Sequence, residues 1–329
     1  MHGARERDVL LAASLYYSHD YTMDAVARRL GTSRSTVSRL LKAAREEGIV
    51  TISIRDPQTN RLGASELVAE RFGVDARVVP LPDDASDAER LNQVATAAAR
   101  ILSGWMDSSM VLGVACGTTT NVISRELAPK PIRGATVVQM AGAANTRSFG
   151  IAFAGGVLSR FAEAFNATVV DFPVPAYFDH LQTKQAMWRE RSISRVLDAQ
   201  AHADIAVFSV GAPAGSVPSY LYSAGYLEAA DFQHLRDNGA VGDVCSVFLP
   251  ADGDHSAIGM NRRASGPTPD QLQSIPRRLC AVAGDAKVDI LIAALRCGAM
   301  TDLVIDQRTA SRLVRAIRST DTTTDTTTE

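Results

Sequence analysis

Residues 23–42, MDAVARRLGTSRSTVSRLLK, carry the pattern that decides the N-terminal fold. Apolar or small side chains recur at helical spacing on both sides of a glycine, at Val26, Ala27, Leu30, Val37 and Leu40. A residue as small as Ala27 allows two helices to cross closely, and Gly31 can adopt the positive φ of a tight turn. The pattern therefore predicts a helix-turn-helix with its turn at Gly31.

The second of these helices has a polar and basic exposed face. Ser33 stands where its hydroxyl can cap the first turn. The exposed positions after it carry hydroxyl or basic side chains, with no acidic residue before Glu46: Arg34, Ser35, Thr36, Ser38, Arg39, Lys42 and Arg45. Hydroxyls and arginines at the start of such a helix suit base edges and phosphates of the major groove, whereas Lys42 and Arg45 are better placed for phosphates. We predict that Ser33 and these seven residues contact double-stranded DNA.

Positive charge is concentrated in this N-terminal segment. The whole chain of 329 residues has a formal net charge of −2, which is not the charge of a non-specific nucleic-acid binder. Residues 1–55 nevertheless hold nine Arg and Lys against six Asp and Glu. DNA binding is therefore expected from the N-terminal segment alone.

A helix over residues 5–17 is expected to complete a three-helix core. Its apolar side chains at helical spacing are Val9, Leu10, Ala13 and Tyr16. Tyr16 and Tyr17 could instead contact DNA, but aromatic rings at this spacing usually face the core, so packing is the preferred interpretation. After Gly48, IVTISI alternates like a short strand, and residues 56–60 break the pattern.

The remaining chain alternates short apolar strands with amphipathic helices, which is typical of parallel β-α-β units. The predicted fold class is an all-α helix-turn-helix domain, residues 1–56, followed by a larger doubly wound α/β domain, residues 76–318. Residues 57–75 are expected to form a linker helix, and residues 319–329 a disordered tail without apolar residues. The expected strands are 76–80, 110–114, 136–140, 168–172, 205–210, 244–248, 279–282 and 302–305.

Several classes of protein are excluded by what the sequence lacks. No apolar run approaches membrane-spanning length, and the N-terminus lacks the apolar core of a signal peptide, so a cytoplasmic location is predicted. The four cysteines are far apart, without a CxxC pair or neighbouring histidines, and we expect reduced thiols and no metal site. No nucleotide-binding glycine motif is present, and no cofactor is expected.

Two turns that follow apolar strands have the composition of an anion site. Gly117, Thr118 and Thr119 open a helix after the expected strand at residues 110–114 and offer backbone N–H groups and hydroxyls to an anion. Gly284 to Lys287 repeat this arrangement after another strand, and the lysine adds a full positive charge. Either turn alone could be a simple helix cap, but together they predict a ligand site.

Other loops hold groups suited to a polyhydroxylated ligand. Asp243, in the sequence GAVGD before an expected strand, could accept sugar hydroxyls or could stabilise a turn, and both interpretations stay open. Asn145 and Arg147, after another strand, are further candidates for the ligand site. Asn261 and Arg262 are weaker ones.

The chain resembles the SorC/DeoR-type family of sugar-responsive bacterial transcriptional regulators. The resemblance covers about residues 8–315 and rests on LYYSHDYTMDAVARRLGTSRSTVSRLLKAAREEGIVTISI, VLGVACGTTTNVISREL, GAVGDVCSVF and AGDAKVDILIAALRCGAMTDLVIDQRTASRLV, in family order. It implies an effector domain similar to sugar-phosphate isomerases. It also implies that Thr118, Thr119 and Lys287 contact an effector phosphate and that Asp243 contacts a sugar hydroxyl.

Two departures from the family pattern bear on the effector. The family often has a glycine pair before the motif's lysine, whereas here Asp285 follows Gly284 and places an acid near the expected phosphate, which favours a neutral sugar or polyol. One branch of the family captures its sugar covalently through a lysine in the loop that here reads AGAANTRSFG, residues 141–150. This loop contains no lysine, so covalent capture is not expected.

Two functions from different classes are compatible with these observations. The leading hypothesis is a regulator of carbohydrate metabolism that acts as a homo-oligomer, a dimer or tetramer, and whose DNA affinity is switched by a sugar, polyol or sugar phosphate. The alternative is a sugar-phosphate isomerase or deaminase with an accessory helix-turn-helix. Such an enzyme needs a placed general base, and no histidine accompanies Asp243 in an evident constellation, so no catalytic residue is predicted.

Overall fold

The computed structural model describes residues 2–18, 21–46, 48–50, 61–145 and 150–325. The chain divides into two compact units, residues 1–59 and 60–329. The expected strand at residues 49–54 and the expected domain boundary at residue 56 lie largely or wholly outside the described residues. No helix in the described ranges is long and apolar enough to cross a membrane.

The smaller unit contains the predicted helix-turn-helix. Helices α1 (His2–Ala13), α2 (Met23–Leu30) and α3 (Arg34–Glu46) are accompanied by a short π-helix, η1 (Ser14–Ser18). Gly31 ends α2 at φ +62°, as the turn requires. Val26 and Val37 are fully buried between the helices. The helix-turn-helix prediction is confirmed.

The first helix packs as predicted except at one position. Val9 and Ala13 are buried, and Tyr16 packs against the core, which supports the inward interpretation of its ring. The expectation for Leu10 is wrong, because its side chain is 58% exposed. The buried stripe of α1 is formed by Val9, Ala12 and Ala13, and the position after Val9 is turned about 100° away from it.

Seven parallel strands form the main sheet of the larger unit, in the order β1-β10-β9-β5-β2-β3-β4. They are β1 (Asp75–Val79), β2 (Val111–Val114), β3 (Thr136–Gln139), β4 (Thr168–Val170), β5 (Ile205–Phe208), β9 (Arg277–Val282) and β10 (Asp302–Asp306). The chain runs from β2 outward to β4, then returns to β5 on the other side of β2. This reversal confirms the predicted doubly wound architecture.

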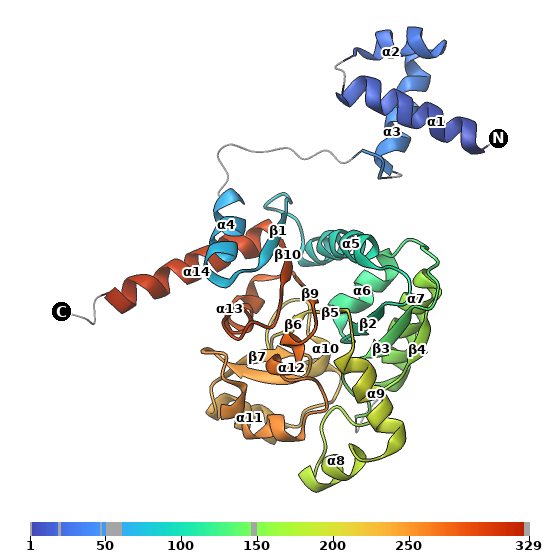
Figure 1. Ribbon diagram of the computed structural model, residues 1–329. Helices are drawn as coiled ribbons and strands as arrows, with labels where there is room; N and C mark the ends of the chain where they lie inside the picture. The colour runs from blue at the N-terminus through green and yellow to red at the C-terminus, as the bar shows by residue number, and fades with distance from the viewer. Residues whose placement is uncertain (1, 19–20, 47, 51–60, 146–149, 326–329) are drawn as a thin grey trace. The chain divides into compact units, whose positions relative to one another are not determined.

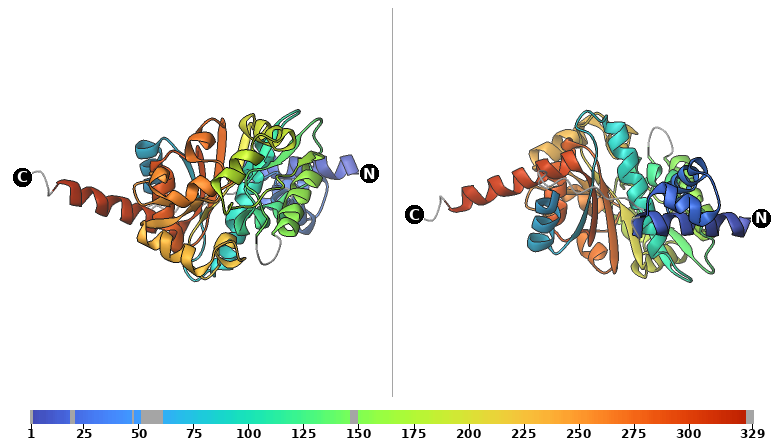
Figure 2. Two further views of the ribbon diagram at one scale, coloured as in Figure 1. Left: turned by 90° about the horizontal axis from the view of Figure 1, so that it is seen from below. Right: turned by 90° about the horizontal axis from the view of Figure 1, so that it is seen from above.

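Helices cover both faces of this sheet (Figures 1 and 2). One face carries α5 (Asp87–Trp105), α6 (Thr118–Glu126) and α7 (Ile151–Phe165), and the other α4 (Arg61–Phe72), α9 (Arg191–Ala201), α13 (Val288–Arg296) and α14 (Gln307–Asp325). Adjacent residues of a strand point to opposite faces of the sheet. Val137 packs in the core under α5, α6 and α7, and Val138 packs in the core on the other face. Shorter helices lie in the connections: α8 (Leu181–Met187), α10 (Tyr220–Ser223), α11 (Ala229–Asp237), α12 (Pro269–Gln273), η2 (His255–Ala257), η3 (Gly259–Arg263) and η4 (Asp285–Lys287).

A second, antiparallel sheet replaces one predicted strand. It contains β6 (Val210–Gly211), β7 (Ala240–Val244) and β8 (Val247–Pro250). The predicted strand 244–248 is therefore wrong, since a two-residue turn at Cys245 and Ser246, with φ of 50° and 69°, lies in its middle. Two-residue hairpins of this kind favour Asn and Gly, and neither residue type was present to mark the turn.

Residues 240–243 belong to strand β7 and not to the predicted loop, whereas Gly239 lies in the turn before the strand. A Cβ on Gly242 would approach the Gly211 carbonyl oxygen to 2.3 Å. The glycine is therefore required by the close backbone of the neighbouring strand β6.

Two predicted boundary segments belong to the larger unit. Helix α4, expected as a linker, packs against β1 and α14 and buries Ala64 and Val68 in the core, so it is part of the α/β unit. Helix α14 runs to Asp325, so the prediction of disorder from residue 319 is wrong through residue 325. The helix is nucleated by its packed first half, and each further residue adds to it at low cost. Residues 326–329 lie outside the described ranges.

A buried ion pair joins the start of α5 to the end of β10. Arg90 and Asp306 are 1% and 0% exposed, and an Arg90 guanidinium N–H donates to Asp306 Oδ1 at 3.3 Å. The guanidinium also donates to the carbonyl oxygens of Pro82, Asp83 and Ala85. Both ions are thus multiply hydrogen-bonded, which is the condition under which a buried pair is tolerated.

We expect Arg90→Ala to lower the free energy of unfolding of the larger unit by about 3–5 kcal/mol, because it leaves a buried carboxylate without its counter-ion. Urea unfolding followed by circular dichroism measures this. Arg100→Ala, on an exposed position of the same helix, is the matched control and should change stability by less than about 0.5 kcal/mol. Equal losses in both variants would contradict the role given to the ion pair.

Candidate functional site

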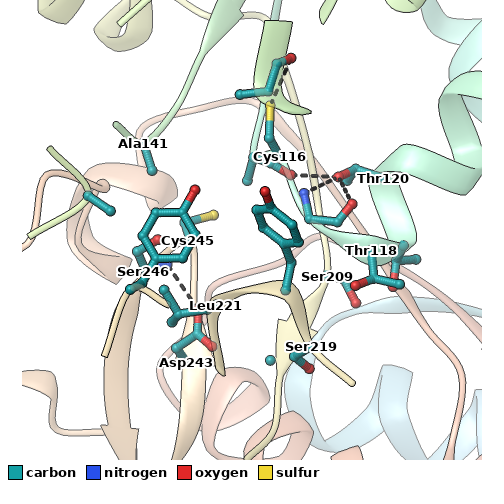
Figure 3. A pocket seen from close by; sticks show the side chains of 18 of the residues that line it. Cys116, Thr118, Thr120, Ala141, Ser209, Ser219, Leu221, Asp243, Cys245 and Ser246 are labelled. Carbon is teal, nitrogen blue, oxygen red and sulfur yellow. Dashed lines mark hydrogen bonds between the residues drawn. The ribbon is translucent and has the colours of Figure 1, made fainter. Parts of the chain in front are cut away.

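A pocket lies where the strand order of the large sheet reverses. β2 and β5 are neighbours, but the chain leaves their carboxyl ends in opposite directions, which opens a crevice between the two loops. The pocket has a volume of about 80 Å³ and is lined by both loops, by the end of β7 and by Lys287. Figure 3 shows Asp243 and Ser246 on one side of it and Cys116 and Thr120 on the other.

The loop after β2 forms the predicted turn at the start of α6. Gly117 is the N-cap residue, and its N–H donates to the Thr120 hydroxyl at 2.8 Å (Figure 3). The Thr118 hydroxyl donates to the Pro218 carbonyl oxygen at 3.0 Å and so holds the loop after β6 against the turn. The predicted residues Gly117, Thr118 and Thr119 all line the pocket.

Lys287 is the only lysine among the pocket-lining residues that the structure describes, and it is 8% exposed. Its Nζ donates to Thr119 Oγ1 at 3.5 Å, the one hydrogen bond of this ammonium within the described ranges. Burial lowers the pKa of Lys287, because the charged form loses its hydration. An anion in the pocket would supply the charge and the acceptors that the ammonium lacks.

Asp243, at the end of β7, faces the same pocket and is 6% exposed. Its Oδ2 accepts the Ser246 N–H at 3.0 Å, which is the predicted turn-stabilising bond, while its buried Oδ1 has no hydrogen-bond partner among the described residues. Burial raises the pKa of Asp243 to about 6, opposed by the Ser246 N–H, Tyr222 and Lys287. Asp243 therefore stabilises the turn and also leaves one oxygen for a ligand hydroxyl.

A glycine keeps this free oxygen accessible. A Cβ on Gly211 would lie 2.0 Å from Asp243 Oδ1. Any side chain at Gly211 would therefore displace the carboxylate or close the space beside it.

One wall of the pocket is formed by three aromatic rings, Phe153, Tyr220 and Tyr226, which were not predicted from the sequence. Phe153 and Tyr220 stack at 3.9 Å between ring centroids, and Tyr226 meets Tyr220 edge-on at 5.8 Å. All three line the pocket, and the Tyr226 hydroxyl donates to the Ala143 carbonyl oxygen. The segment GAPAGSVPSYLYSAGYL, residues 211–227, marks the wall in the sequence by placing tyrosines in a glycine- and serine-rich stretch after a strand.

The remaining predicted ligand residues are not all in the pocket. Gly284 lines a neighbouring cavity of about 370 Å³, which shares Lys287 with the pocket. Asn145 donates to the Ala224 carbonyl oxygen and is not a lining residue, and Arg147 lies outside the described residues. Asn261 is wrong as a candidate, because its amide is used to bind the backbone of Phe248.

Asp285 does not face the pocket. Its carboxylate pairs with Arg308 at 3.0 Å and with Arg312 at 3.6 Å, both on α14. Two positive charges compensate the acid on the side of the turn away from Thr119. Asp285 therefore does not favour a neutral effector over an anionic one.

In the smaller unit, the predicted DNA-contact residues lie on the exposed side of α3. Ser33 caps the helix, since its hydroxyl accepts the Thr36 N–H at 3.2 Å. Thr36 is half-buried and accepts a hydrogen bond from Arg39 at 3.4 Å. The exposed members of the set are Arg34, Ser35, Ser38, Arg39, Lys42 and Arg45. Their spacing places Ser35, Ser38, Arg39 and Lys42 on one helical stripe.

Comparison with known proteins assigns a family to both units. Residues 56–315 match the model of the sugar-binding domain family, and residues 4–51 match that of homeodomain-like domains. The deoxyribonucleoside regulator of Bacillus subtilis (strain 168) is 32% identical over 306 residues, 92% of this chain and 96% of the relative.

Solved structures agree with this assignment. A domain of a possible sugar-binding transcriptional regulator from Arthrobacter aurescens TC1 is 41% identical, with a TM-score of 0.74 over 79% of this chain and all of that chain. The full-length sorbitol operon regulator SorC from Klebsiella pneumoniae, 22% identical, shares the fold with a TM-score of 0.67 over 94% of this chain and 98% of that chain.

The raised pKa of Asp243 predicts a pH-dependent stability. From about pH 4 to pH 6 the folded state binds more protons than the unfolded state, so this carboxylate lowers stability as the pH rises, by up to about 3 kcal/mol above pH 6. Asp243→Asn should therefore be more stable than the parent at pH 7.5 and equally stable near pH 4. Thermal unfolding across this range measures the difference. The exposed Asp198→Asn is the control and should follow the parent, and a pH-independent effect of Asp243→Asn would argue against a buried ionising carboxylate.

Proposed function

Since the chain belongs to the SorC/DeoR-type family of sugar-binding transcriptional regulators, we propose that its smaller unit binds a double-stranded DNA operator and that a sugar, polyol or sugar phosphate in the pocket changes this affinity. The relatives named above are regulators, two of them of deoxyribonucleoside and sorbitol genes by name. By linkage, the effector changes DNA affinity by the same factor as DNA changes effector affinity.

One observation carries the effector proposal: the pocket holds two buried groups of different chemistry. The Lys287 ammonium, together with the first turn of α6, is suited to an anion. Asp243 Oδ1 is a buried acceptor without a hydrogen-bond partner in the described ranges, which suits a hydroxyl donor. A phosphorylated sugar or polyol carries both groups, and the rings of Phe153 and Tyr220 offer apolar area to its carbon chain.

We propose that Gly117, Thr118, Thr119 and Lys287 hold the phosphate and that Asp243 accepts a hydroxyl. Gly284 acts by shaping the turn that carries Lys287. The Asn145 side chain supports the aromatic wall through a hydrogen bond with the Tyr226 hydroxyl. Arg147, in the same loop as Asn145, remains a proposed contact on sequence grounds alone.

The function proposed does not include catalysis. Isomerases and deaminases of sugar phosphates need a placed acid and base. Asp243 is accompanied in the pocket by the Lys287 ammonium and by hydroxyl, phenol and thiol groups, and no histidine is among the lining residues that the structure describes.

A homo-oligomer, dimer or tetramer, is part of the proposal. One helix-turn-helix reads a half-site, and symmetric operators require paired modules. We also propose a cytoplasmic location, because the proposed operator is chromosomal DNA.

The first test is a fluorescence-anisotropy titration of DNA upstream of the protein's own gene, with and without a panel of sugars, polyols and their phosphates. Sequence-specific DNA binding whose affinity is changed by one compound supports the proposal. DNA binding without sequence preference that no compound changes, together with turnover of a sugar phosphate, would overturn the proposal in favour of an enzyme.

Substitutions on α3 should separate base contacts from phosphate contacts. Arg39→Ala should weaken operator binding by about 1–3 kcal/mol and relax sequence preference, whereas Lys42→Ala should weaken all DNA sequences alike and reduce the salt slope by about 1. The same anisotropy titration over a range of salt concentrations measures both. Arg100→Ala, on the larger unit, should leave DNA binding unchanged. A parent-like affinity for both α3 variants would place the DNA contact elsewhere.

Lys287→Met should weaken a phosphorylated effector by about 1.5–3 kcal/mol, since it removes a charge-assisted contact, and a neutral polyol much less. Titration calorimetry with both kinds of ligand measures the difference. Lys130→Met is the matched control, because the ammonium of that lysine also donates hydrogen bonds, to the carbonyl oxygens of Ser103 and Met106, but lies outside the pocket. Equal effects of both substitutions on phosphate binding would remove Lys287 from the site.

A further inference from the structure

The turn that carries Lys287 is held from behind by the first turn of α14. The Gly284 N–H donates to Thr309 Oγ1 at 3.0 Å and also to Asp306 Oδ2 at 3.4 Å. The Thr309 hydroxyl in turn donates to Asp306 Oδ2 at 2.5 Å. Thr309 and Asp306 are both fully buried, although neither lines the pocket.

Asp306 is itself fixed, so it provides a rigid support for Thr309. Its Oδ1 accepts the N–H groups of Arg308 and Thr309, each at 3.1 Å, in addition to the Arg90 guanidinium. The carboxylate therefore has acceptor bonds on both oxygens and cannot rotate without breaking several of them. On the outer side of the turn, Asp285 is bound by Arg308 and Arg312.

The turn needs such support for two reasons. Gly284 has φ +105°, and the helical segment after it, Asp285–Lys287, is only three residues long. Lys287 is buried with a single hydrogen bond in the described ranges, and burial of a charge favours any movement that returns the ammonium to water. A turn free to shift would carry the ammonium away from Thr119.

We propose that Thr309 is a positioning residue of the effector pocket, which fixes the Gly284 turn through its hydroxyl and so keeps the Lys287 ammonium beside Thr119. This inference rests on the proposed function of the pocket as an effector site. It adds to that proposal a residue outside the pocket, and it assigns the start of α14 a role in ligand binding.

The chain offers a matched control at the other end of β10. Thr301 accepts the Arg278 N–H at 2.8 Å and donates to Asp302 Oδ2 at 2.7 Å. Its hydroxyl thus makes the same pair of bonds as that of Thr309, to a backbone N–H and to an aspartate. It lies at the amino end of the strand, away from the pocket. Thr309→Val and Thr301→Val therefore remove equivalent bonds at opposite ends of one strand.

The first measurement is the acetylation rate of Lys287 by acetic anhydride, read by mass spectrometry with Lys130 as the internal reference. Thr309→Val should increase the rate about five- to tenfold, because loss of one buried hydrogen bond shifts the turn's equilibrium by about that factor. Thr301→Val should leave it unchanged, and Thr309→Ser, which keeps the hydroxyl, should restore the parent rate. Equal Lys287 rates in Thr309→Val and Thr301→Val would overturn the proposal.

The second measurement is binding of inorganic phosphate, by the rise in melting temperature of each variant relative to its own phosphate-free value. Thr309→Val should show a smaller rise than the parent, and Thr301→Val the same rise. If phosphate does not stabilise the parent while Thr309→Val still raises acetylation, Thr309 positions Lys287 as proposed and the phosphate part of the proposed function fails. If phosphate stabilises Thr309→Val as much as the parent, the positioning role is overturned and the pocket stands.

Discussion

The reversal of strand order between β2 and β5 is the constraint on which the larger unit's site depends. Where two neighbouring parallel strands send the chain in opposite directions, no crossover helix can cover the gap between their carboxyl ends. The loops at residues 115–120 and 209–221 form the walls of this gap, and β7 closes it from the side. The position of the pocket follows from the connectivity, while its chemistry follows from the residues placed on these loops.

Two buried ionisable groups, Lys287 and Asp243, determine the chemistry of the pocket. Burial lowers the pKa of Lys287 and raises that of Asp243, so each group is disfavoured in its charged form. No direct ion pair joins them within the described ranges. A ligand that offered an anion to Lys287 and a hydroxyl donor to Asp243 would offset the desolvation cost of both groups. The core ion pair of Arg90 and Asp306 differs, because its two charges compensate each other directly.

Sequence reasoning gave the architecture because its patterns are local. Gly31 and the small residues of α2, the apolar strands, and the glycine turns at residues 117 and 284 each report on a few neighbouring residues. It failed where the decisive contact is distant: Gly242 is a strand residue because β6 passes close to it, and the positive φ of Cys245 and Ser246 is imposed by the hairpin. For the same reason the compensation of Asp285 by α14 could not be read from local sequence.

The placement of α14 limits how an effector could influence DNA binding. The Gly284 turn is bonded to the first turn of α14, and α14 packs along α4, which is the first element of the larger unit after the helix-turn-helix in the chain. Because Ala64 and Val68 of α4 are buried in the core, α4 is part of the packed larger unit and does not act as an independent linker. Continuous contacts therefore lead from the Lys287 turn through α14 to α4. A packed interface such as that between α14 and α4 can convert a small shift at one site into a discrete change at another. A coupling free energy between effector and DNA requires such a connection.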